Sequence, residues 1–373
     1  MNPKTIRLRT FLRATLTVAA VITSSITWAN PPDGVLDQTH ASVRAVMAVQ
    51  AEVTPELMRW PDVLGTAVGV DDSGTASLLV YVDQDGHGVS DVVRALPAQL
   101  RGIAVKAELT DKFRAFRGKP GGGGTGHTAF QAPPIQLGTS GGWRKDLANG
   151  YCCGGTLGSL IQMNGTQYIL SNYHVFESDI VPGGNGTVAT TGDNIIQPGL
   201  IDVGCNANSA QNVATLVKVS SLPGSNVDCS VAQVISGQVR SDGAILEIST
   251  ISSQTVGASL NQAVKKSGRT TGLSRSKVNG LNATISITYD NECAGGTAFT
   301  KVFTGQIVIA NQGSSFLNSG DSGSLMVEDL TTNPRAVGLL YAGCSTSAIA
   351  NPIAEVLQFL GGKLGGTATM VGN

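Results

Sequence analysis

Charged residues are scarce in this chain. They make up 14% of its 373 residues, and the formal net charge is −1 at pH 7. A nucleic-acid partner would require a basic patch or stripe that neutralises phosphates, and this composition argues against one. Glycine, by contrast, occurs 47 times, among many serine, threonine and asparagine residues. This balance favours a secreted, loop-rich, mostly β protein.

Long apolar runs are also missing beyond the first 30 residues. Residues 1–29 combine a basic start, a short apolar stretch at 16–26 and the ending Thr27-Trp28-Ala29. These features are typical of a cleaved signal peptide. A membrane anchor is the alternative, but the stretch is too short and too rich in threonine and serine to span well. We therefore expect a secreted protein, extracellular or periplasmic, with no membrane association after signal cleavage.

Cysteine is absent from the first 150 residues. The six cysteines all come later, at Cys152, Cys153, Cys205, Cys229, Cys293 and Cys344. In an exported protein an even number favours disulfides, although the sequence does not choose among the pairings. A zinc site is the weaker alternative, because no CxxC pair is present and no histidine lies at ligand spacing. Neither a metal nor another cofactor is expected.

The chain is too long for one ordinary domain. Residues 30–117 predict a small α/β domain that would serve as a pro-domain or, alternatively, as an appended binding module. Its expected order is helix, strand, strand, helix and strand, at residues 35–58, 63–70, 76–82, 89–100 and 103–109. This order suits a sheet with helices on one face.

A Gly- and Pro-rich segment at 118–134 predicts a flexible linker that is open to proteolytic nicking. From residue 135 onwards, short apolar runs alternate with Gly, Asn and Ser turns, which predicts β-barrels. A hairpin is expected around Asn164-Gly165. We place a first barrel at 135–240 and a second at 241–373, the latter with a C-terminal helix at 353–360.

One serine lies in a setting that suits nucleophilic attack. Ser322 stands between two glycines in Gly320-Asp321-Ser322-Gly323-Ser324. The glycines allow a sharp turn, and the amides of Gly320 and Ser322 would then form an oxyanion hole. An ordinary surface turn is the alternative, because motifs this short recur by chance.

A serine hydroxyl needs a base to take its proton and an acid to orient that base. His174 is the candidate base, since it is the only histidine after residue 127 and follows an apolar strand. Asp228 is the preferred acid, because it leads into a small apolar run where a buried carboxylate needs a partner. Asp193 and Asp202 are the competing acids. The order His, Asp, Ser is one of several known for this chemistry, and it is the order of double-barrel proteases.

These motifs resemble those of the chymotrypsin-like (trypsin-like) serine peptidases of the PA clan. The run Val-Lys-Lys-Ser-Gly-Arg-Thr-Thr-Gly at 264–272 is similar to the entry of the second barrel in bacterial alpha-lytic and streptogrisin-type proteases. The runs at 337–343 and 345–353 also resemble a group related to the Narrow leaf protease. The resemblance implies a double six-stranded antiparallel β-barrel preceded by a pro-domain. It covers about 60% of the chain through four short motifs, counting those of His174 and Ser322.

The resemblance assigns further residues. In the alpha-lytic-like group a basic side chain pairs with the acid before the nucleophile, and the resemblance gives this role to Lys266 with Asp321. No activation site for a new buried N-terminus is visible. The residues just before the nucleophile and a strand opposite them would line the primary pocket, namely Phe316, Leu317, Tyr341, Ala342 and Gly343. No acid stands there, so we expect an apolar preference. Two departures, Ser-Asn-Tyr before His174 and Ser324 in place of a third glycine, remove no reacting atom.

The sequence thus favours a secreted serine endopeptidase that acts on protein or peptide substrates through an acyl-enzyme, with its own N-terminal domain as an intramolecular inhibitor or chaperone. The alternatives are a catalytically silent, protease-like binding protein and a protease that processes only itself. An esterase with the same triad is a third possibility. The α/β-hydrolase order Ser, Asp, His does not fit this chain.

Overall fold

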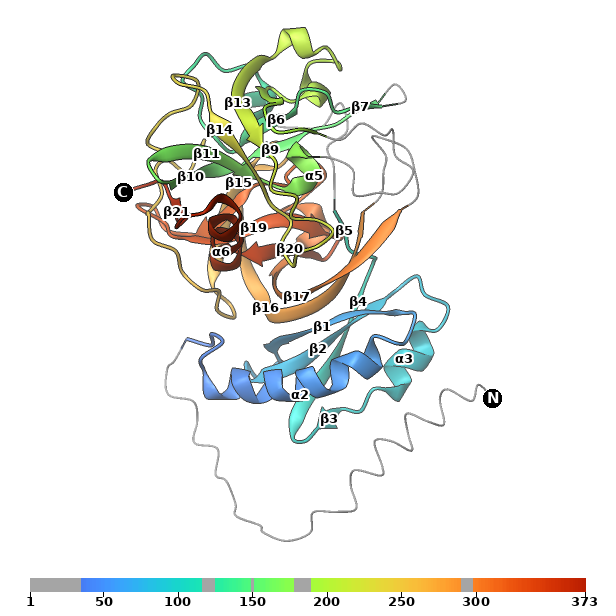
Figure 1. The fold of residues 1–373 in the computed structure, drawn as a ribbon. Coiled ribbons are helices and arrows are strands. Elements are labelled where there is room, and N and C mark those ends of the chain that lie inside the picture. The colour runs from blue at the N-terminus through green and yellow to red at the C-terminus, as the bar shows by residue number, and fades with distance from the viewer. Residues whose placement is uncertain (1–34, 116–124, 149–150, 178–188, 290–297) are drawn as a thin grey trace.

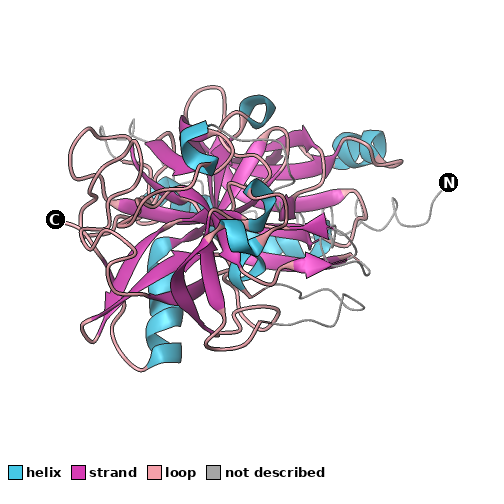
Figure 2. Ribbon diagram, turned by 90° about the horizontal axis from the view of Figure 1, so that it is seen from above, coloured by secondary structure: helices cyan, strands magenta, loops and turns pink. Residues whose placement is uncertain are grey.

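The structure is a computed structural model, and it describes residues 35–115, 125–148, 151–177, 189–289 and 298–373. The predicted signal peptide at 1–29 lies outside the described residues. Strands predominate (Figure 2), which confirms the mostly β prediction. Within the described ranges, every helix is too short or too polar to cross a membrane.

The first barrel is built from seven strand segments that follow one another around a curled sheet. They are β6 (Thr139–Trp143), β9 (Gly155–Leu157), β10 (Ser159–Met163), β11 (Thr166–Ser171), β12 (Asn194–Gln197), β13 (Gln211–Val217) and β14 (Ser230–Val234). Strand β9 pairs with β6, while β10 pairs with β11, and only Gly158 separates β9 from β10. The stretch 155–163 therefore acts as one bent strand that closes a ring of six.

A tight turn joins β10 to β11 as the sequence predicts. Asn164 and Gly165 both have positive φ, at 49° and 77°, which a two-residue hairpin turn of this type requires. The bend at Gly158 has a steric cause. A Cβ built there would lie 2.0 Å from the carbonyl oxygen of Gly323, so only glycine allows the first barrel to approach the serine turn this closely.

The second barrel has six strands of its own. They are β15 (Ala263–Gly268), β16 (Gly272–Tyr289), β17 (Phe299–Ala310), β18 (Leu325–Glu328), β19 (Ala336–Gly343) and β20 (Ser347–Pro352). The hydrogen-bonded order is β15-β18-β19-β20-β17-β16, and β15 also pairs with β16, which closes the ring. The prediction of two six-stranded barrels is confirmed.

The N-terminal region has the predicted α/β order. Its elements are α2 (Ala41–Leu57), β1 (Val63–Val70), β2 (Ala76–Asp83), α3 (Val89–Ala95), β3 (Gln99–Leu100) and β4 (Ile103–Thr110). Helix α3 is shorter than predicted. Leu96 precedes a proline and has an extended backbone with ψ at 127°, because the proline ring disfavours the helical conformation of the residue before it.

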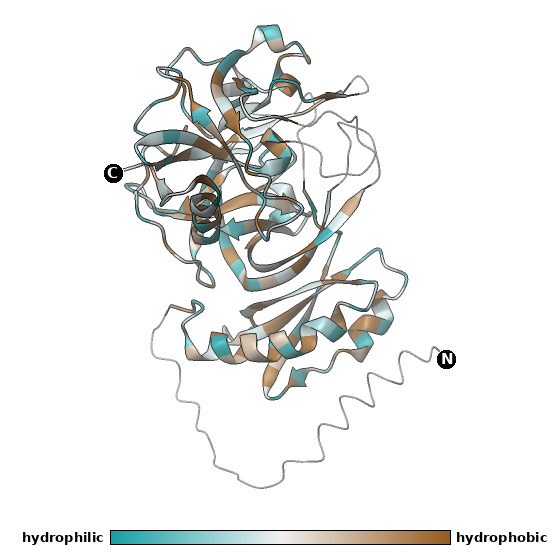
Figure 3. Cartoon of the chain, viewed as in Figure 1, coloured by the Kyte–Doolittle hydropathy of each residue, from teal (hydrophilic) through white to brown (hydrophobic). Residues whose placement is uncertain are grey.

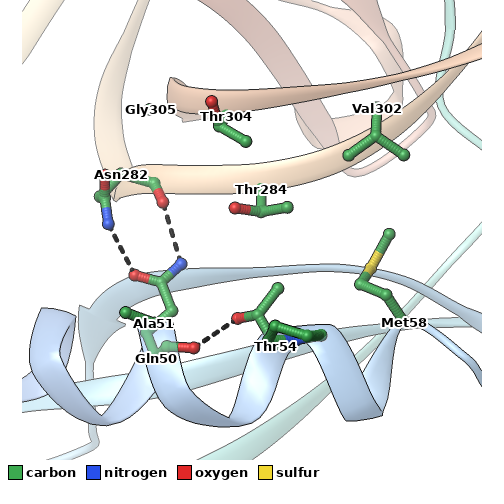
Figure 4. A pocket seen from close by; sticks show the side chains of 10 residues that line it. Gln50, Ala51, Thr54, Met58, Asn282, Thr284, Val302, Thr304 and Gly305 are labelled. Atoms are coloured by element: carbon green, nitrogen blue, oxygen red, sulfur yellow. Dashed lines mark hydrogen bonds between the residues drawn. The ribbon is translucent and has the colours of Figure 1, made fainter.

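The N-terminal region and the second barrel share one sheet. Strand β1 pairs antiparallel with β16, so that β1, β2, β4 and β3 extend the barrel sheet downwards in Figure 1. Helix α2 covers this extension and borders a groove of about 450 Å³ against β16 and β17 (Figure 4). At the end of that groove, Gln50 and Asn282 exchange two hydrogen bonds of 2.9 Å.

Apolar residues are spread over the N-terminal region and the two barrels (Figure 3). One core cluster contains residues of α2 and β2 together with residues of the second barrel. Another core fills the first barrel and also includes Ile353, Val356 and Leu360 of helix α6 (Ile353–Leu364). Strand β21 (Thr369–Met370) pairs with β10. The C-terminal end therefore packs on the first barrel.

Helix α6 differs from the prediction at its end. Gly361 and Gly362 were expected to close it, but it continues to Leu364 and ends at Gly365, which has φ at 74° and ψ at 41°. A left-handed glycine of this kind is a common helix C-cap. Burial of Leu360 and Gly361 against the first barrel outweighs the low helix propensity of the two glycines.

The described part of the predicted linker is ordered. Helix α4 (Thr125–Thr128) contains His127, which is 5% exposed. The His127 ring nitrogens lie 2.7 Å from Glu247 Oε2 and 2.9 Å from the carbonyl oxygen of Gly138. Gln131 also makes hydrogen bonds to Gln136 and Thr139. This end of the linker is therefore fastened to both barrels.

The cysteines that the structure describes divide into two groups, and Cys293 lies outside the described residues. Cys152 and Cys205 form a disulfide within the first barrel, and Cys153 is also disulfide-bonded. Cys229 and Cys344 are buried free thiols. Burial raises the pKa of the Cys229 thiol well above its ordinary range, which keeps it protonated and unreactive.

Candidate active site

His174 lies on a single helical turn, α5 (Tyr173–Phe176), directly after β11. Strand β11 pairs with β14 so that Ser171 faces Ser230. This antiparallel register brings the residues just beyond β11 beside those just before β14, and His174 Nδ1 lies 2.6 Å from Asp228 Oδ2. His174 is 3% exposed and Asp228 is 0% exposed. The two residues therefore form a buried acid–base pair.

The Asp228 carboxylate accepts hydrogen bonds on both oxygens. The backbone N–H of Tyr173 donates to Oδ1 at 2.7 Å, and the hydroxyl of Tyr289 donates to Oδ2 at 2.8 Å. The Asp228 main chain is held as well, because its N–H donates to Asn351 Oδ1 at 2.9 Å. A buried carboxylate with this many donors is fixed in one orientation.

The two competing acids, Asp193 and Asp202, form hydrogen bonds and ion pairs with other residues. Asp202 accepts the guanidinium of Arg269 on both oxygens and the Ser140 hydroxyl on Oδ2. Asp193 pairs with Lys145 at 2.6 Å and accepts a hydrogen bond from the Trp143 ring. Of the three candidate acids, Asp228 is the one that contacts His174.

The outer nitrogen of His174 is available. His174 Nε2 is buried and has no hydrogen-bond partner within the described part of the chain. The imidazole lies edge-to-face with the Tyr289 ring, at 6.0 Å between centroids. An imidazole with Nδ1 on a carboxylate and an unoccupied Nε2 has the arrangement that a general base requires.

The serine turn depends on its two glycines. Gly320 and Gly323 have φ at 98° and 94°, a region that other residues rarely adopt. A Cβ on Gly323 would also lie 2.2 Å from Ser171 Oγ. The Ser322 side chain is 1% exposed, and its Oγ lies 3.4 Å from the carbonyl oxygen of Tyr341.

Gly155 brings the serine and histidine segments together. A Cβ built on Gly155 would lie 2.6 Å from Val175 Cγ2 and 3.0 Å from the carbonyl oxygen of Ser322. The residue after His174 and the backbone of Ser322 therefore approach the same point of β9. Two segments about 150 residues apart in the chain meet there, at the junction of the barrels.

Thr156 fixes the peptide planes of the serine turn. Its N–H donates to the carbonyl oxygen of Ser322 at 2.9 Å, and its hydroxyl donates to the carbonyl oxygen of Gly320 at 2.9 Å. The Thr156 hydroxyl also accepts the N–H of Arg269 at 3.0 Å. Both residues predicted to supply oxyanion-hole amides are therefore anchored through their carbonyls by one first-barrel threonine.

Asp321 forms a second buried pair with Lys266. The Lys266 Nζ and Asp321 Oδ2 atoms are 3.2 Å apart, and both side chains are 0% exposed. Asp321 also accepts the N–H groups of Thr270 and Thr271 on Oδ1 and that of Asn318 on Oδ2. Burial lowers the pKa of Lys266, and the charge of Asp321 opposes that shift.

Lys265, the neighbour of Lys266, is also buried. It is 5% exposed on β15, and its Nζ donates to the carbonyl oxygen of Leu330 at 2.6 Å.

The predicted pocket residues are all buried. Phe316 and Leu317 are 1% exposed, and Tyr341 and Ala342 are 0% exposed. A Cβ on Gly343 would lie 3.0 Å from Leu317 Cδ2, which places the two predicted walls against each other. Asn311 joins them, because its Oδ1 accepts the N–H groups of Phe316 and Leu317 while its Nδ2 donates to the carbonyl oxygen of Cys344.

A short strand of the N-terminal region lies on this pocket wall. Strand β5 (Arg114–Ala115) pairs antiparallel with β19 at Gly343 and parallel with the end of β16 at Thr288 and Tyr289. The neighbouring Phe113 is fully buried in a cluster with Tyr173, Tyr289 and Tyr341. The segment therefore bridges β16 and β19 next to His174 and Ser322.

Three residues of this site were missed from the sequence, namely Thr156, Tyr289 and Asn351. The alternation of apolar residues at 281, 283, 285, 287 and 289 indicates that Tyr289 points inward. That pattern does not reveal a carboxylate from the other barrel at its hydroxyl. Thr156 and Asn351 carry no local signal, because their partners lie far away in the sequence.

Residues 206–351 match the family model of the Nal1 C-terminal domain, which covers under half of the chain. No curated protein sequence matches the chain.

Several solved serine proteases are similar to this chain at low identity and low TM-score. A Thermobifida fusca protease A is 16% identical with a TM-score of 0.40, and the match covers 64% of this chain and 99% of that protein. A Cellulomonas bogoriensis chymotrypsin is 17% identical with a TM-score of 0.37, over 64% and 99%. A glutamic acid specific serine protease is 16% identical with a TM-score of 0.41, over 63% and 100%. The strand pairing gives this chain two six-stranded barrels. The chain is similar to chymotrypsin-like bacterial serine proteases and, over residues 206–351, to the Nal1 C-terminal domain.

Proposed function

We propose that this protein is a secreted serine endopeptidase. The observation that carries the proposal is the buried His174–Asp228 pair, whose imidazole keeps Nε2 unpartnered beside a serine turn built on two left-handed glycines. This combination of acid, base and constrained serine is the arrangement that acyl transfer needs.

In the proposed reaction, Ser322 Oγ attacks the carbonyl carbon of the scissile peptide bond while His174 Nε2 takes the hydroxyl proton. The amides of Gly320 and Ser322 stabilise the oxyanion, and Thr156 anchors the same turn through the carbonyl groups of these two residues. His174 then gives the proton to the leaving amine, which leaves an acyl-enzyme. Water attacks the ester with His174 as base, and the proton returns to Ser322 Oγ as the acid product departs. Asp228 stays ionised and orients the imidazole throughout.

Secretion is supported by two features. Residues 1–29 have the composition of a signal peptide. The Cys152–Cys205 disulfide requires an oxidising compartment.

The pocket chemistry favours apolar side chains. Phe316, Leu317 and Tyr341 are aromatic and aliphatic residues that lie in apolar clusters. No carboxylate stands among the five predicted pocket residues, so cleavage after arginine or lysine is not expected.

We also propose that the N-terminal domain inhibits the enzyme in the intact chain. Strand β5 lies on β19 at Gly343, where an extended substrate would add as a strand to the same wall. Asp111 accepts the N–H of Ser345 at 3.0 Å, and Thr110 lies 2.6 Å from Thr346 Oγ1. These contacts hold the segment 110–115 against the end of β19.

The attachment of the N-terminal domain favours one alternative, a protease that processes only itself. The shared sheet between β1 and β16 would keep the N-terminal domain bound even after the chain is cut. A silent binding protein is the other alternative.

A peptide-hydrolysis assay separates these functions. The whole chain is compared before and after nicking between residues 118 and 134, with a peptide panel that varies the residue before the scissile bond. A secreted endopeptidase cleaves after apolar residues once nicked, and a self-processing protease yields only its own fragments. Absence of any cleavage in both forms would overturn the proposal, and strong preference after Arg, Lys or Glu would overturn the pocket assignment.

A further inference from the structure

The Tyr289 hydroxyl contacts the acid of the proposed triad. It donates to Asp228 Oδ2 at 2.8 Å, and the same oxygen lies 2.6 Å from His174 Nδ1. Tyr289 is 3% exposed and ends strand β16 of the second barrel, whereas Asp228 belongs to the first barrel. The hydrogen bond therefore crosses from one barrel to the other.

We propose that Tyr289 is a positioning residue that holds the Asp228 carboxylate in register with His174. This inference rests on the proposed function. In the described residues, the first barrel fixes Oδ1 through the N–H of Tyr173, and Tyr289 is the second-barrel group that fixes Oδ2. The carboxylate is thus anchored at both oxygens, one from each barrel, and the imidazole shares Oδ2 with the Tyr289 hydroxyl.

The ring of Tyr289 is itself held in place. Its centroid lies 6.4 Å from that of Phe303 and 6.5 Å from that of Phe299, in tilted contacts on β17. Phe303 continues to Tyr341, at 5.1 Å between centroids. Tilted aromatic contacts at these distances are favourable. The ring that carries the hydroxyl is therefore packed and held in one position.

The hydroxyl remains a donor across the neutral range. Burial, and then the charge of Asp228, raise the pKa of Tyr289 well above its ordinary value of 10. A tyrosine that stays protonated can donate to the carboxylate but cannot compete with it as a base.

Two other buried tyrosines sharpen the contrast. The hydroxyls of Tyr81 and Tyr341 are buried and have no hydrogen-bond partner in the part of the chain that the structure describes. Burial of a tyrosine in this molecule therefore does not by itself produce a hydroxyl contact. The contact at Tyr289 arises because β16 ends opposite Asp228.

Tyr289→Phe tests the inference, because it keeps the ring and removes only the hydroxyl. The matched control is Tyr81→Phe, which removes a buried hydroxyl without a described partner from strand β2 of the N-terminal region. Two readouts are measured on the whole chain, nicked in the linker with both pieces retained. One is the rate of Ser322 labelling by a fluorophosphonate, and the other is the low-field proton resonance of the His174–Asp228 hydrogen bond.

We expect Tyr289→Phe to slow labelling about tenfold, since a hydrogen bond to a charged group contributes at that level. We also expect the low-field His174 resonance to shift, which a merely structural loss of packing would not produce. Tyr81→Phe should leave both readouts at the wild-type value. Wild-type labelling and an unshifted resonance in Tyr289→Phe would overturn the inference.

Two further measurements keep the test decisive. If Tyr289→Phe does not fold, the Tyr289 hydroxyl proton is observed in the wild-type chain with isotope-labelled tyrosine. A slowly exchanging hydroxyl that moves in Asp228→Asn supports the contact, and a rapidly exchanging one overturns it. If wild-type Ser322 is never labelled while the resonance still shifts in Tyr289→Phe, the proposed function fails and the positioning contact stands.

Discussion

Two buried carboxylates in this molecule are surrounded differently. Asp321 and Asp228 are both 0% exposed, and each is paired with a basic side chain. The partners of Asp321 come from the second barrel alone, whereas those of Asp228 come from both barrels. Lys266 Nζ also has further partners in Thr271 and Gly272, whereas His174 Nε2 has none in the described ranges.

This difference indicates that the two clusters have different roles, one in holding the serine turn and one in the proposed reaction. A buried pair whose polar atoms are all satisfied has nothing left to react with, and it fixes the loop around it. In the other pair, one nitrogen of the base is buried without a hydrogen bond, which costs free energy. Such an atom is free to accept a proton, and groups of this kind cluster at functional sites. We therefore assign the Asp321 cluster to holding the serine turn and the Asp228 cluster to the reaction.

The largest expected effect breaks the reactive cluster itself. Ser322→Ala should lower turnover of an apolar peptide substrate by about six powers of ten, as removal of a triad nucleophile does. The melting temperature should stay near the wild-type value, because the turn is carried by Gly320 and Gly323. Turnover within about tenfold of wild type would contradict the assignment of the nucleophile.

Asp228→Asn should have the next largest effect. An amide in place of the carboxylate can no longer hold the imidazole N–H in the correct tautomer, and in a comparable triad this change lowers kcat by about 10⁴. The matched control is Asp193→Asn at a competing acid, which contacts Lys145 and Trp143 instead. Peptide hydrolysis measures both variants. An equal loss in the two would remove the basis for choosing Asp228.

Lys266→Met tests the scaffold cluster. Removing one partner of a buried pair typically costs about 3–5 kcal/mol of unfolding free energy. Lys265→Met is the control, since Lys265 donates only to the carbonyl oxygen of Leu330 and should cost about 1 kcal/mol. Denaturant unfolding measures both. A loss in Lys266→Met no larger than in Lys265→Met would mean that the pair does not hold the turn.

The pH dependence of that difference has a definite sign. Burial lowers the pKa of Lys266 below its ordinary 10.5, so the unfolded chain binds more protons than the folded chain between the lowered value and pH 10.5. The contribution of Lys266 to stability therefore rises with pH across this window. The stability gap between wild type and Lys266→Met should widen in the same direction. A gap that narrows with rising pH would contradict the lowered pKa.

The smallest expected effect concerns strand β5, which pairs with the ends of β16 and β19. Phe113→Ala removes a fully buried ring next to β5 and should weaken its docking by about 3 kcal/mol. The intact chain should then label faster with a fluorophosphonate than the wild type does. Phe130→Ala is the control, because Phe130 is 56% exposed. Labelling that does not change in Phe113→Ala would argue against inhibition by this strand.

Much of this arrangement could be predicted from the sequence where its signals are local. The glycines around Ser322 and the Asn164-Gly165 pair predict tight turns, and these residues have positive φ in the structure. His174 could be chosen because few histidines compete with it. The alternation of apolar runs and turns predicted the two barrels.

The remaining features depend on contacts between distant segments. Pairing of β1 with β16 and of β5 with β19 follows from free sheet edges meeting in space, which no local pattern encodes. The hydroxyl of Tyr289 and the amide of Asn351 meet Asp228 from another barrel. The motifs predicted the candidate reacting groups but not the residues that contact them from the other barrel.

The most direct test of the central claim is mass-spectrometric localisation of a fluorophosphonate on the linker-nicked chain. The account predicts a single adduct on Ser322 that disappears in His174→Ala. An unlabelled Ser322 in the nicked wild type, or an adduct that forms equally fast without His174, would contradict the assignment of a histidine-activated serine.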